Sequence, residues 1–165
     1  MRISATCLLA FALAAPAIAA DTAVVRHPLP NGSKFPISSA VEVPAGKTTV
    51  YLSGTVPKVA DAAAAAGSVA AYGDTRTQTI SVLTSIQDQL KALGLGMGDV
   101  IKMQVFLVGD PAKDGKLDFA GMMEGYTQFF GTEQQPALPV RSAMQVAALA
   151  NPGFLVEIEV VAVRP

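Results

Sequence analysis

The stretch that decides the fold lies near the end of the 165-residue chain: PVRSAMQVAAL at residues 139–149, then ANPG, then FLVEIEVVAV at residues 154–163. Both long runs alternate between apolar and polar residues, which is typical of strands that bury one face. The break between them contains Asn151, Pro152 and Gly153, a combination typical of a tight turn. The pattern therefore predicts an antiparallel hairpin that closes the chain.

The apolar residues of these two runs indicate which face of the hairpin is buried. The apolar sets are Val140, Met144, Val146 and Ala148 in the first run, and Phe154, Val156, Ile158, Val160 and Ala162 in the second. A register that keeps both sets on one core gathers the polar residues on the other face, within roughly 5–8 Å of each other. Those polar residues are Arg141, Gln145, Glu157 and Glu159. The sequence thus predicts a cluster of one guanidinium and two carboxylates.

Two interpretations of this polar cluster remain open. Charged cross-strand pairs are common on the solvated face of an antiparallel sheet, so the first interpretation is an ordinary surface. In the second interpretation another subunit covers the face, and the cluster lines a site. Two observations favour the second: only 15% of the residues are charged, and Leu155, Val161 and Val163 share the face.

The beginning of the chain has the pattern of a secretory signal peptide. A short positive start with Arg2 is followed by an apolar run, and small residues around Ala19 and Ala20 offer cleavage sites. Cleavage after either alanine fits the pattern, and we take residues 1–20 as the leader and residues 21–165 as a single domain. The mature protein is then expected to be exported to the periplasm or out of the cell.

Composition excludes several kinds of chemistry for the mature chain. The only cysteine, Cys7, leaves with the leader, so disulfides, cysteine nucleophiles and cysteine metal sites are excluded. The only histidine, His27, lies in a Pro-rich lead and belongs to no metal-binding or catalytic-triad motif. What remains is carboxylate, guanidinium, hydroxyl and backbone groups. Such a set suits binding a small anion through Arg and moving a proton with Glu.

Charge and hydropathy give little support to a macromolecular partner. Removing Arg2 leaves 11 of the 12 basic residues against 13 acidic ones, a formal charge of −2. Neither nucleic acid nor an anionic membrane surface is an expected partner of such a chain. After the leader, no stretch is apolar for long enough to span a bilayer.

The middle of the chain alternates between strand and helix patterns. Strands are expected at residues 37–43, 48–53 and 99–108, with the first two joined as a hairpin through a turn at 44–47. Helices are expected at 75–93, capped by Asp74 or Thr75 and ended by Gly94, and at 117–130, ended by Gly131. Residues 56–72 form either a short helix or a surface loop.

The resulting order, β-β-α-β-α-β-β, predicts an α+β fold in which two amphipathic helices cover one face of a mixed sheet. The second helix carries a stripe of Phe119, Met122, Tyr126 and Phe129. Stripes of this kind usually belong to the core, and we interpret this one so. The other face of the sheet must then meet water or a partner.

Five blocks in the chain stand out together: VYLSG at 50–54, GDVIKMQVFLV at 98–108, FAGMMEGYTQFF at 119–130, VRSAMQVAAL at 140–149 and VEIEVVAV at 156–163. In order and spacing they resemble the RidA (YjgF) family of imine and enamine deaminases. The resemblance extends from about Phe35 to the C-terminus, which is most of the mature chain. Its most specific part is the closing pair of runs.

The resemblance implies a chorismate-mutase-like α+β fold, assembled as a homotrimer with a ligand cleft at each subunit interface. Family members with the full set of site residues hydrolyse 2-imino or enamino acids, such as 2-aminoacrylate and its tautomer 2-iminopropanoate, to 2-keto acids and ammonia. No cofactor is required. By the same resemblance, Arg141 would bind the substrate carboxylate, Glu157 would activate the attacking water, and Ser53 would line the site.

Three candidate site residues depart from the family pattern. Ala143 stands in place of a cysteine, Met123 in place of an asparagine, and Ile37 in place of a tyrosine. These changes imply a more apolar substrate pocket with fewer hydrogen-bond donors. The leading hypothesis is an exported deaminase of small carboxylate-bearing imines that uses neither a cofactor nor a metal. The alternatives are a trimeric module that binds a small carboxylate without turnover, and an interaction protein whose clefts are vestigial.

Overall fold

The computed structural model describes residues 23–165, so the predicted leader at 1–20 lies outside the described residues. The strands are β1 (Val25–His27), β2 (Ala40–Glu42), β3 (Thr49–Thr55), β4 (Val100–Val108), β5 (Val140–Val146) and β6 (Val156–Val163). The helices are α1 (Val69–Tyr72), α2 (Thr75–Ala92) and α3 (Phe119–Tyr126). Single 3-10 turns lie at Pro30–Gly32, Met97–Asp99 and Pro111–Lys113.

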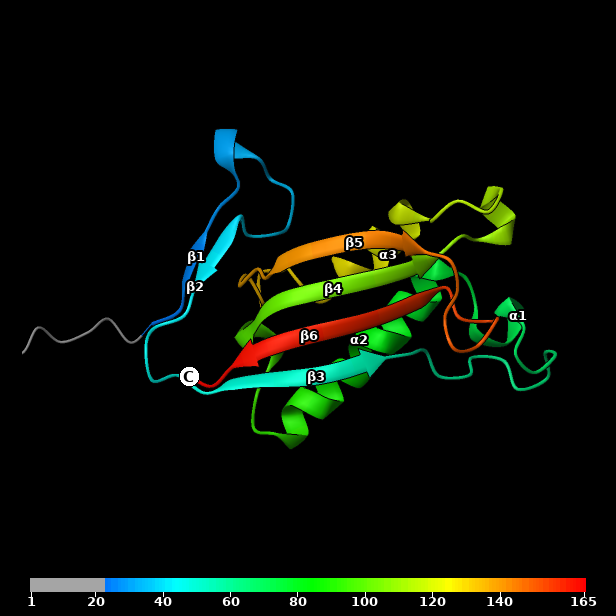
Figure 1. Cartoon of the computed structure of the whole chain (residues 1–165), viewed down its shortest axis with the longest axis horizontal. Coiled ribbons are helices and arrows are strands. Elements are labelled where there is room, and N and C mark those ends of the chain that lie inside the picture. Colours follow the sequence, from blue (N-terminus) through cyan, green and yellow to red (C-terminus); the bar gives the residue numbers. More distant parts are fainter. Residues whose placement is uncertain (1–22) are drawn as a thin grey trace, which may run out of the picture.

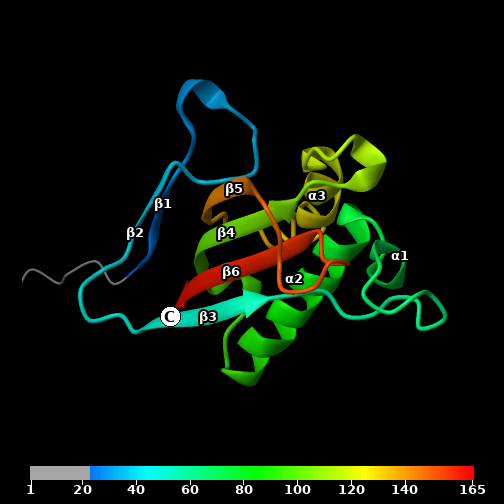
Figure 2. The same cartoon turned by 45° about the vertical axis from the view of Figure 1, so that its right-hand side comes forward.

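Four of the strands form one mixed sheet in the order β3-β6-β4-β5. Strands β4 and β5 are parallel, and the other two neighbouring pairs are antiparallel. Helices α2 and α3 lie behind this sheet, and its other face is open (Figures 1 and 2). Strands β1 and β2 pair with each other in a separate ribbon to one side of the sheet. The predicted α+β architecture, with two helices on one face of a mixed sheet, is confirmed.

The predicted closing hairpin is wrong, because β4 lies between β5 and β6. The turn at Asn151 does form, with Gly153 N–H donating to the Asn151 side chain at 2.8 Å and Phe154 N–H donating to the Asn151 carbonyl at 3.0 Å. This turn bends the long connection of residues 147–155, and it does not join two strands that pair with each other. That connection is long enough for β6 to enter the sheet on the far side of β4, where its apolar residues gain two paired neighbours instead of one.

The predicted hairpin between residues 37–43 and 48–53 is also wrong. Strand β3 pairs with β6 instead, and β2 pairs with β1, which the sequence analysis left in the irregular lead. The turn before β3 forms, with Gly46 at φ 85°, but it joins two different sheets. A three-residue strand gives too short a pattern to detect, and the partner of β3 is set by burial against α2.

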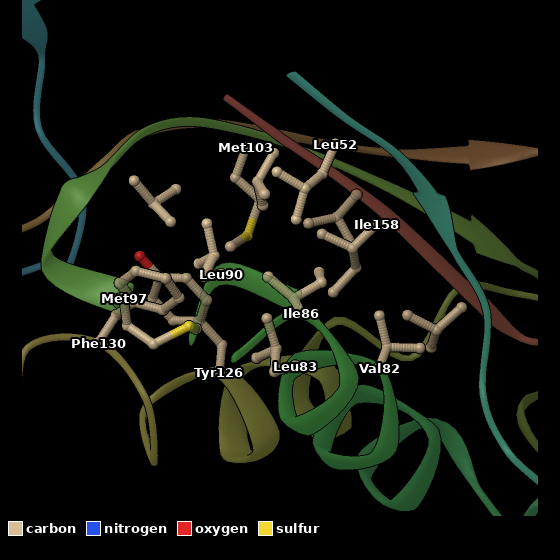
Figure 3. Packing of buried hydrophobic residues seen from close by; sticks show 14 of the residues in the cluster. Leu52, Val82, Leu83, Ile86, Leu90, Met97, Met103, Tyr126, Phe130 and Ile158 are labelled. Carbon is tan, nitrogen blue, oxygen red and sulfur yellow. The ribbon is translucent and has the colours of Figure 1, made fainter. Parts of the chain in front are cut away.

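Helix α2 agrees closely with the predicted helix at 75–93. Thr77 N–H donates to the Asp74 side chain at 2.8 Å, and Gly94 follows the helix at φ 71°, so both predicted ends are confirmed. Its buried face packs on β3, β4 and β6 and forms the core shown in Figure 3, with Leu83, Ile86 and Leu90 fully buried. It is not long and apolar enough to cross a membrane, and neither are the other helices in residues 23–165.

Helix α3 is shorter than the predicted helix at 117–130 and packs closely against α2. A side chain at Gly125 would place its Cβ 2.8 Å from Thr79 Cβ and 3.2 Å from the Arg76 carbonyl. The glycine therefore lets the two helices approach, which sets how far α3 stands from the sheet. The rings of Tyr126 and Phe130 stack with their centres 4.9 Å apart and lie at the Met97 end of the core shown in Figure 3.

A buried glutamine fixes the connection that replaces the predicted hairpin. The fully buried Gln78 accepts a hydrogen bond from Leu155 N–H at 2.7 Å and donates to the carbonyls of Gly73 and Gly153, both at 2.9 Å. Replacing Gln78 with Leu leaves three backbone groups without their partner, and we expect the free energy of unfolding to fall by about 2–4 kcal/mol in urea denaturation.

The matched control is Gln87→Leu, the same change at an exposed position of the same helix. Its unfolding free energy should stay within about 0.5 kcal/mol of the native value. Equal losses in the two variants would contradict a clamping role for Gln78.

Candidate active site

Arg141 lies on β5, the edge strand of the sheet, and its side chain is on the face covered by helices. Its register partner on β4 is Met103, which is fully buried. The guanidinium carbon lies 4.3 Å from the ring centre of Tyr126, 5.4 Å from that of Phe35 and 5.8 Å from that of Phe119. All three distances are within the range of cation–π attraction. Aromatic rings from α3 and from the segment before β2 therefore enclose this guanidinium.

The Arg141 guanidinium has no counter-ion within residues 23–165. No carboxylate there lies within 4.0 Å of it, and its one side-chain hydrogen bond goes from Nη1 to the Met122 sulfur at 4.0 Å. Burial lowers the pKa of Arg141 below its ordinary value, and the nearby Tyr126 acts in the opposite direction. A half-buried cation with unused donors is costly to hold, and a bound anion would offset that cost.

Tyr126 links the guanidinium to the segment that carries Phe35. Its hydroxyl donates to the Pro36 carbonyl at 2.8 Å, and its ring lies under Arg141. Burial raises the pKa of Tyr126 to about 12, against a smaller opposing effect from Arg141. The phenol is therefore neutral at physiological pH and keeps both its hydrogen bond and its attraction for the cation. Tyr126 holds Arg141 and its aromatic surroundings in one arrangement.

A cavity of about 400 Å³ opens at the beginning of β5. Its walls include Arg141, Ile37, Leu29, Val140 and Ser142. A second cavity of about 320 Å³ shares Leu29 and Ile37 with the first and is also lined by Phe35. The structure thus brings two of the predicted site residues, Arg141 and Ile37, to one mostly apolar cavity.

Glu157 does not join this cavity, because it lies on the opposite face of the sheet from Arg141. Arg141 is level with Met103 on β4, whereas Glu157 is level with Phe106, and residues three apart on a strand face opposite sides. The predicted cluster on one face of a ribbon is therefore wrong within a single chain. Gln145 follows Arg141 on the helix side, and Glu159 follows Glu157 on the open side.

The error comes from β5 and not from β6. In β6 the even residues Val156, Ile158, Val160 and Ala162 are buried, as predicted. In β5 the parity is reversed: Met144 is 39% exposed on the open face, and Ala143 packs against the core. An edge strand beside a single neighbour buries less, so a small alanine and the aliphatic stem of Arg141 can fill its helix-facing side.

Glu157 has its own surroundings on the open face, beside Ser53 and Gly54. The pairing of β3 with β6 is irregular between Leu52 and Thr55, so both intervening residues bulge next to β6. A Cβ added at Gly54 would overlap the Glu157 carboxylate, with its Cδ only 2.9 Å away. The glycine therefore makes room for this carboxylate, and the predicted residue Ser53 precedes the glycine in the same irregular stretch of β3.

The two remaining predicted site residues, Met123 and Ala143, line neither the cavity at Arg141 nor the surroundings of Glu157. Met123 is a partly buried residue of α3 that packs on the core, as Ala143 does from β5. Phe35, Phe119 and Tyr126 surround Arg141 without having been predicted as site residues. Two of them belong to the α3 stripe that was interpreted as core, and a tyrosine inside an apolar stripe was the one available signal. Residues 23–165 hold no group of three or more His, Cys, Asp or Glu side chains that could bind a metal ion.

Comparison with known proteins agrees with this fold. The model of the endoribonuclease L-PSP family, which is the YjgF/RidA family, matches residues 33–164. The chain belongs to this family. Among curated relatives, the RutC family protein PH0854 of Pyrococcus horikoshii is 39% identical over 92 residues, which cover 56% of this chain and 64% of that protein.

Two further relatives bear on chemistry. The 2-iminobutanoate/2-iminopropanoate deaminase of Escherichia coli K12 is 36% identical over 91 residues, covering 55% of this chain and 65% of that protein. The crystal structure of E. coli TdcF with bound serine matches 85% of this chain and 94% of that chain, with 34% identity and a TM-score of 0.55. The sequence matches to the Pyrococcus protein and to the iminobutanoate deaminase each cover a little less than two thirds of that relative's length. The fold is that of the YjgF proteins, which is chorismate-mutase-like.

The buried phenol beneath Arg141 gives a measurable titration. Tyr126 should ionise near pH 12, because burial disfavours its phenolate. Ultraviolet absorbance of phenolate during a pH titration of the folded protein measures this. The Tyr126→Phe variant should lack this step.

The same shift makes stability depend on pH. Since the pKa of Tyr126 is higher in the folded than in the unfolded chain, its contribution is complete below pH 10 and is lost as pH rises toward 12. The native protein should therefore lose unfolding free energy over that interval, and Tyr126→Phe should lose less. Identical losses in both proteins would show that this phenol is not the group responsible.

Proposed function

We propose that this protein is a hydrolytic deaminase of reactive 2-imino and enamino acids, which it converts to 2-keto acids and ammonia. The observation that carries the proposal is the half-buried Arg141 guanidinium, which borders a cavity and has no counter-ion in residues 23–165. A planar guanidinium can bind a substrate carboxylate through two parallel hydrogen bonds. Membership of the YjgF/RidA family, and a relative named as an iminobutanoate deaminase, support the same reaction class.

The chemistry needs one further group, and Glu157 is suited to it. With the carboxylate held by Arg141, the Glu157 carboxylate accepts a proton from water as the oxygen attacks C2 of the imine. The proton then passes to the nitrogen, which gives an intermediate with one hydroxyl and one amino group on C2. As the C–N bond breaks, the hydroxyl proton moves to the nitrogen, so that ammonia leaves and a keto group remains. One water is consumed for each ammonia released, and no oxidant or cofactor is needed. Ser53 precedes Gly54, whose backbone lies against the Glu157 carboxylate, and would line that side of the site.

A site that uses both residues must be built from two copies of the chain. Arg141 and Glu157 lie on opposite faces of one sheet, so Arg141 of one copy has to meet Glu157 of another. The open face offers apolar surface for such contact, with Tyr51 77% exposed and Met144 39% exposed. We propose a homotrimer with a ligand cleft at each of three equivalent interfaces.

The proposed setting follows from the first twenty residues and from the charge. With the leader at 1–20 removed, the protein would act outside the cytoplasm, in the periplasm or beyond the cell. Its partners would be further copies of itself and a small carboxylate-bearing substrate, with neither nucleic acid nor a membrane involved. Reactive imines formed in that compartment would be the substrates.

One observation favours a second candidate function. The cavity at Arg141 is lined by a single chain and excludes Glu157, so it could hold a small carboxylate without any catalysis. The protein would then be a carboxylate-binding module. Turnover separates the two functions, because only the deaminase requires Glu157.

The first test measures ammonia or keto acid release from imino acids generated in place by an amino-acid oxidase. We expect Arg141→Ala and Glu157→Gln each to lower kcat/KM at least about 100-fold, since each removes a group that contacts the reacting substrate. Matched controls are Arg76→Ala on the exposed side of α2 and Glu159→Gln two residues along β6, and both should retain activity. A native protein that binds 2-keto acids without any turnover would instead support the binding module.

The second test asks whether the two residues come from different copies. Equal amounts of Arg141→Ala and Glu157→Gln chains are unfolded together and refolded, which mixes them in the same trimers. Random mixing leaves one intact site in most trimers, so activity should return to about a quarter of the native value. No recovery in trimers that native mass spectrometry shows to contain both variants would overturn the site shared between copies.

A further inference from the structure

Two exposed phenylalanine rings stand beside the Arg141 guanidinium. Phe35 and Phe119 have ring centres 6.3 Å apart and planes within 11° of parallel. The guanidinium carbon of Arg141 lies nearly equally far from both, at 5.4 and 5.8 Å. The rings come from the segment before β2 and from the first turn of α3, so folding alone brings them together. We name them the phenylalanine pair.

The phenylalanine pair is not used by the hydrophobic core. Phe35 is 39% exposed and Phe119 is 41% exposed, and neither belongs to the buried cluster under the sheet. Leaving two large apolar rings in water is unfavourable in proportion to their exposed area. Both rings lie within cation–π range of the Arg141 guanidinium, which has no counter-ion in residues 23–165. A ligand that combines an apolar group with an anionic group would therefore fit both features.

Besides Arg141, the cavity is bordered by Lys102 and by three serines, two of which already have hydrogen-bond partners within the chain. The Ser38 hydroxyl donates to the Leu138 carbonyl at 2.7 Å, and the Ser39 hydroxyl donates to the Pro28 carbonyl at 2.9 Å. Both hydroxyls are thus occupied by the chain itself. Ile37 adds another apolar wall and is shared with the neighbouring cavity that Phe35 lines. Apolar surface therefore runs from the guanidinium outward.

We propose that the phenylalanine pair selects substrates with a large apolar side chain, best an aromatic one, over substrates with a methyl group. The proposal rests on the carboxylate-binding role proposed for Arg141. A carboxylate held there leaves the side chain of the ligand to contact Phe35 and Phe119. A phenyl group can cover both exposed rings, whereas a methyl group removes little of their area from water.

The test compares kcat/KM for the imine made from phenylalanine with kcat/KM for the imine made from alanine. The native protein should favour the phenylalanine-derived imine by at least about tenfold, the range that a few buried carbons give in an apolar pocket. Phe35→Ala and Phe119→Ala should each reduce that preference about tenfold, because each removes a ring that the phenyl group of the substrate would contact. The matched control is Leu93→Ala, which removes an exposed apolar side chain beyond the end of α2.

A binding measurement separates this proposal from the proposed reaction. Titration calorimetry with phenylpyruvate and with pyruvate needs no turnover, and the same preference and the same losses are expected. Absence of turnover together with this binding pattern would refute the deaminase and still support the selection. Turnover without a preference, or with a preference that neither variant alters, would overturn the proposed role of the phenylalanine pair. The proposed deaminase function would stand. Dissociation of the assembly in both variants would likewise overturn the proposed role of the pair, because the pair would then be an interface between copies.

Discussion

The alternation of side chains across the central strand β4 is the constraint on which the rest of the molecule depends. Met103 on β4 is level with Arg141 on β5, and Phe106 on β4 is level with Glu157 on β6. Successive residues of a strand point to opposite faces, so no rotamer change brings these two charges together through a hydrogen-bonded sheet. The helices α2 and α3 lie on one face, and the other face is open (Figure 2). Chemistry that needs both groups therefore depends on assembly, whereas binding at the guanidinium does not.

Aromatic rings hold the Arg141 charge in a way that a carboxylate could not. An internal carboxylate would form a strong bidentate pair and would occupy the donors that a ligand needs. The face of Tyr126, at 4.3 Å, attracts the cation while leaving the edges of its plane free to donate. Such attraction is worth about 0.5–2 kcal/mol, too little to offset full desolvation, which agrees with the lowered pKa of Arg141. The site is thus stable enough to form and still gains from an anion.

Local periodicity explains what the sequence could predict, and pairing between distant segments explains what it could not. Helix α2, its Asp74 cap and the buried face of β6 follow from patterns contained within each element, and all three are confirmed. Which strands are neighbours is a property of the whole sheet. The closing hairpin failed because β4 lies between β5 and β6, and the first hairpin failed because β2 and β3 belong to different sheets. The edge position of β5 reversed its parity and moved Arg141 to the helix side. The surroundings of that guanidinium include Phe35, which is more than a hundred residues earlier in the chain and carries no pattern of its own.

The position of Phe35 is nevertheless fixed by backbone contacts that do not depend on its own side chain. Ser38 N–H donates to the Pro139 carbonyl at 2.9 Å, and the Tyr126 hydroxyl donates to the Pro36 carbonyl at 2.8 Å. These bonds tie the segment to β5 on one side and to α3 on the other, so the wall beside Arg141 is formed before any ligand arrives. A preformed wall costs less ordering on binding than a loop that closes afterwards. Because its ties are to main-chain carbonyls, residues 35 and 37 can vary without releasing the segment. The apolar character of this cavity can therefore have arisen at those two positions while the carboxylate-binding guanidinium stayed in place.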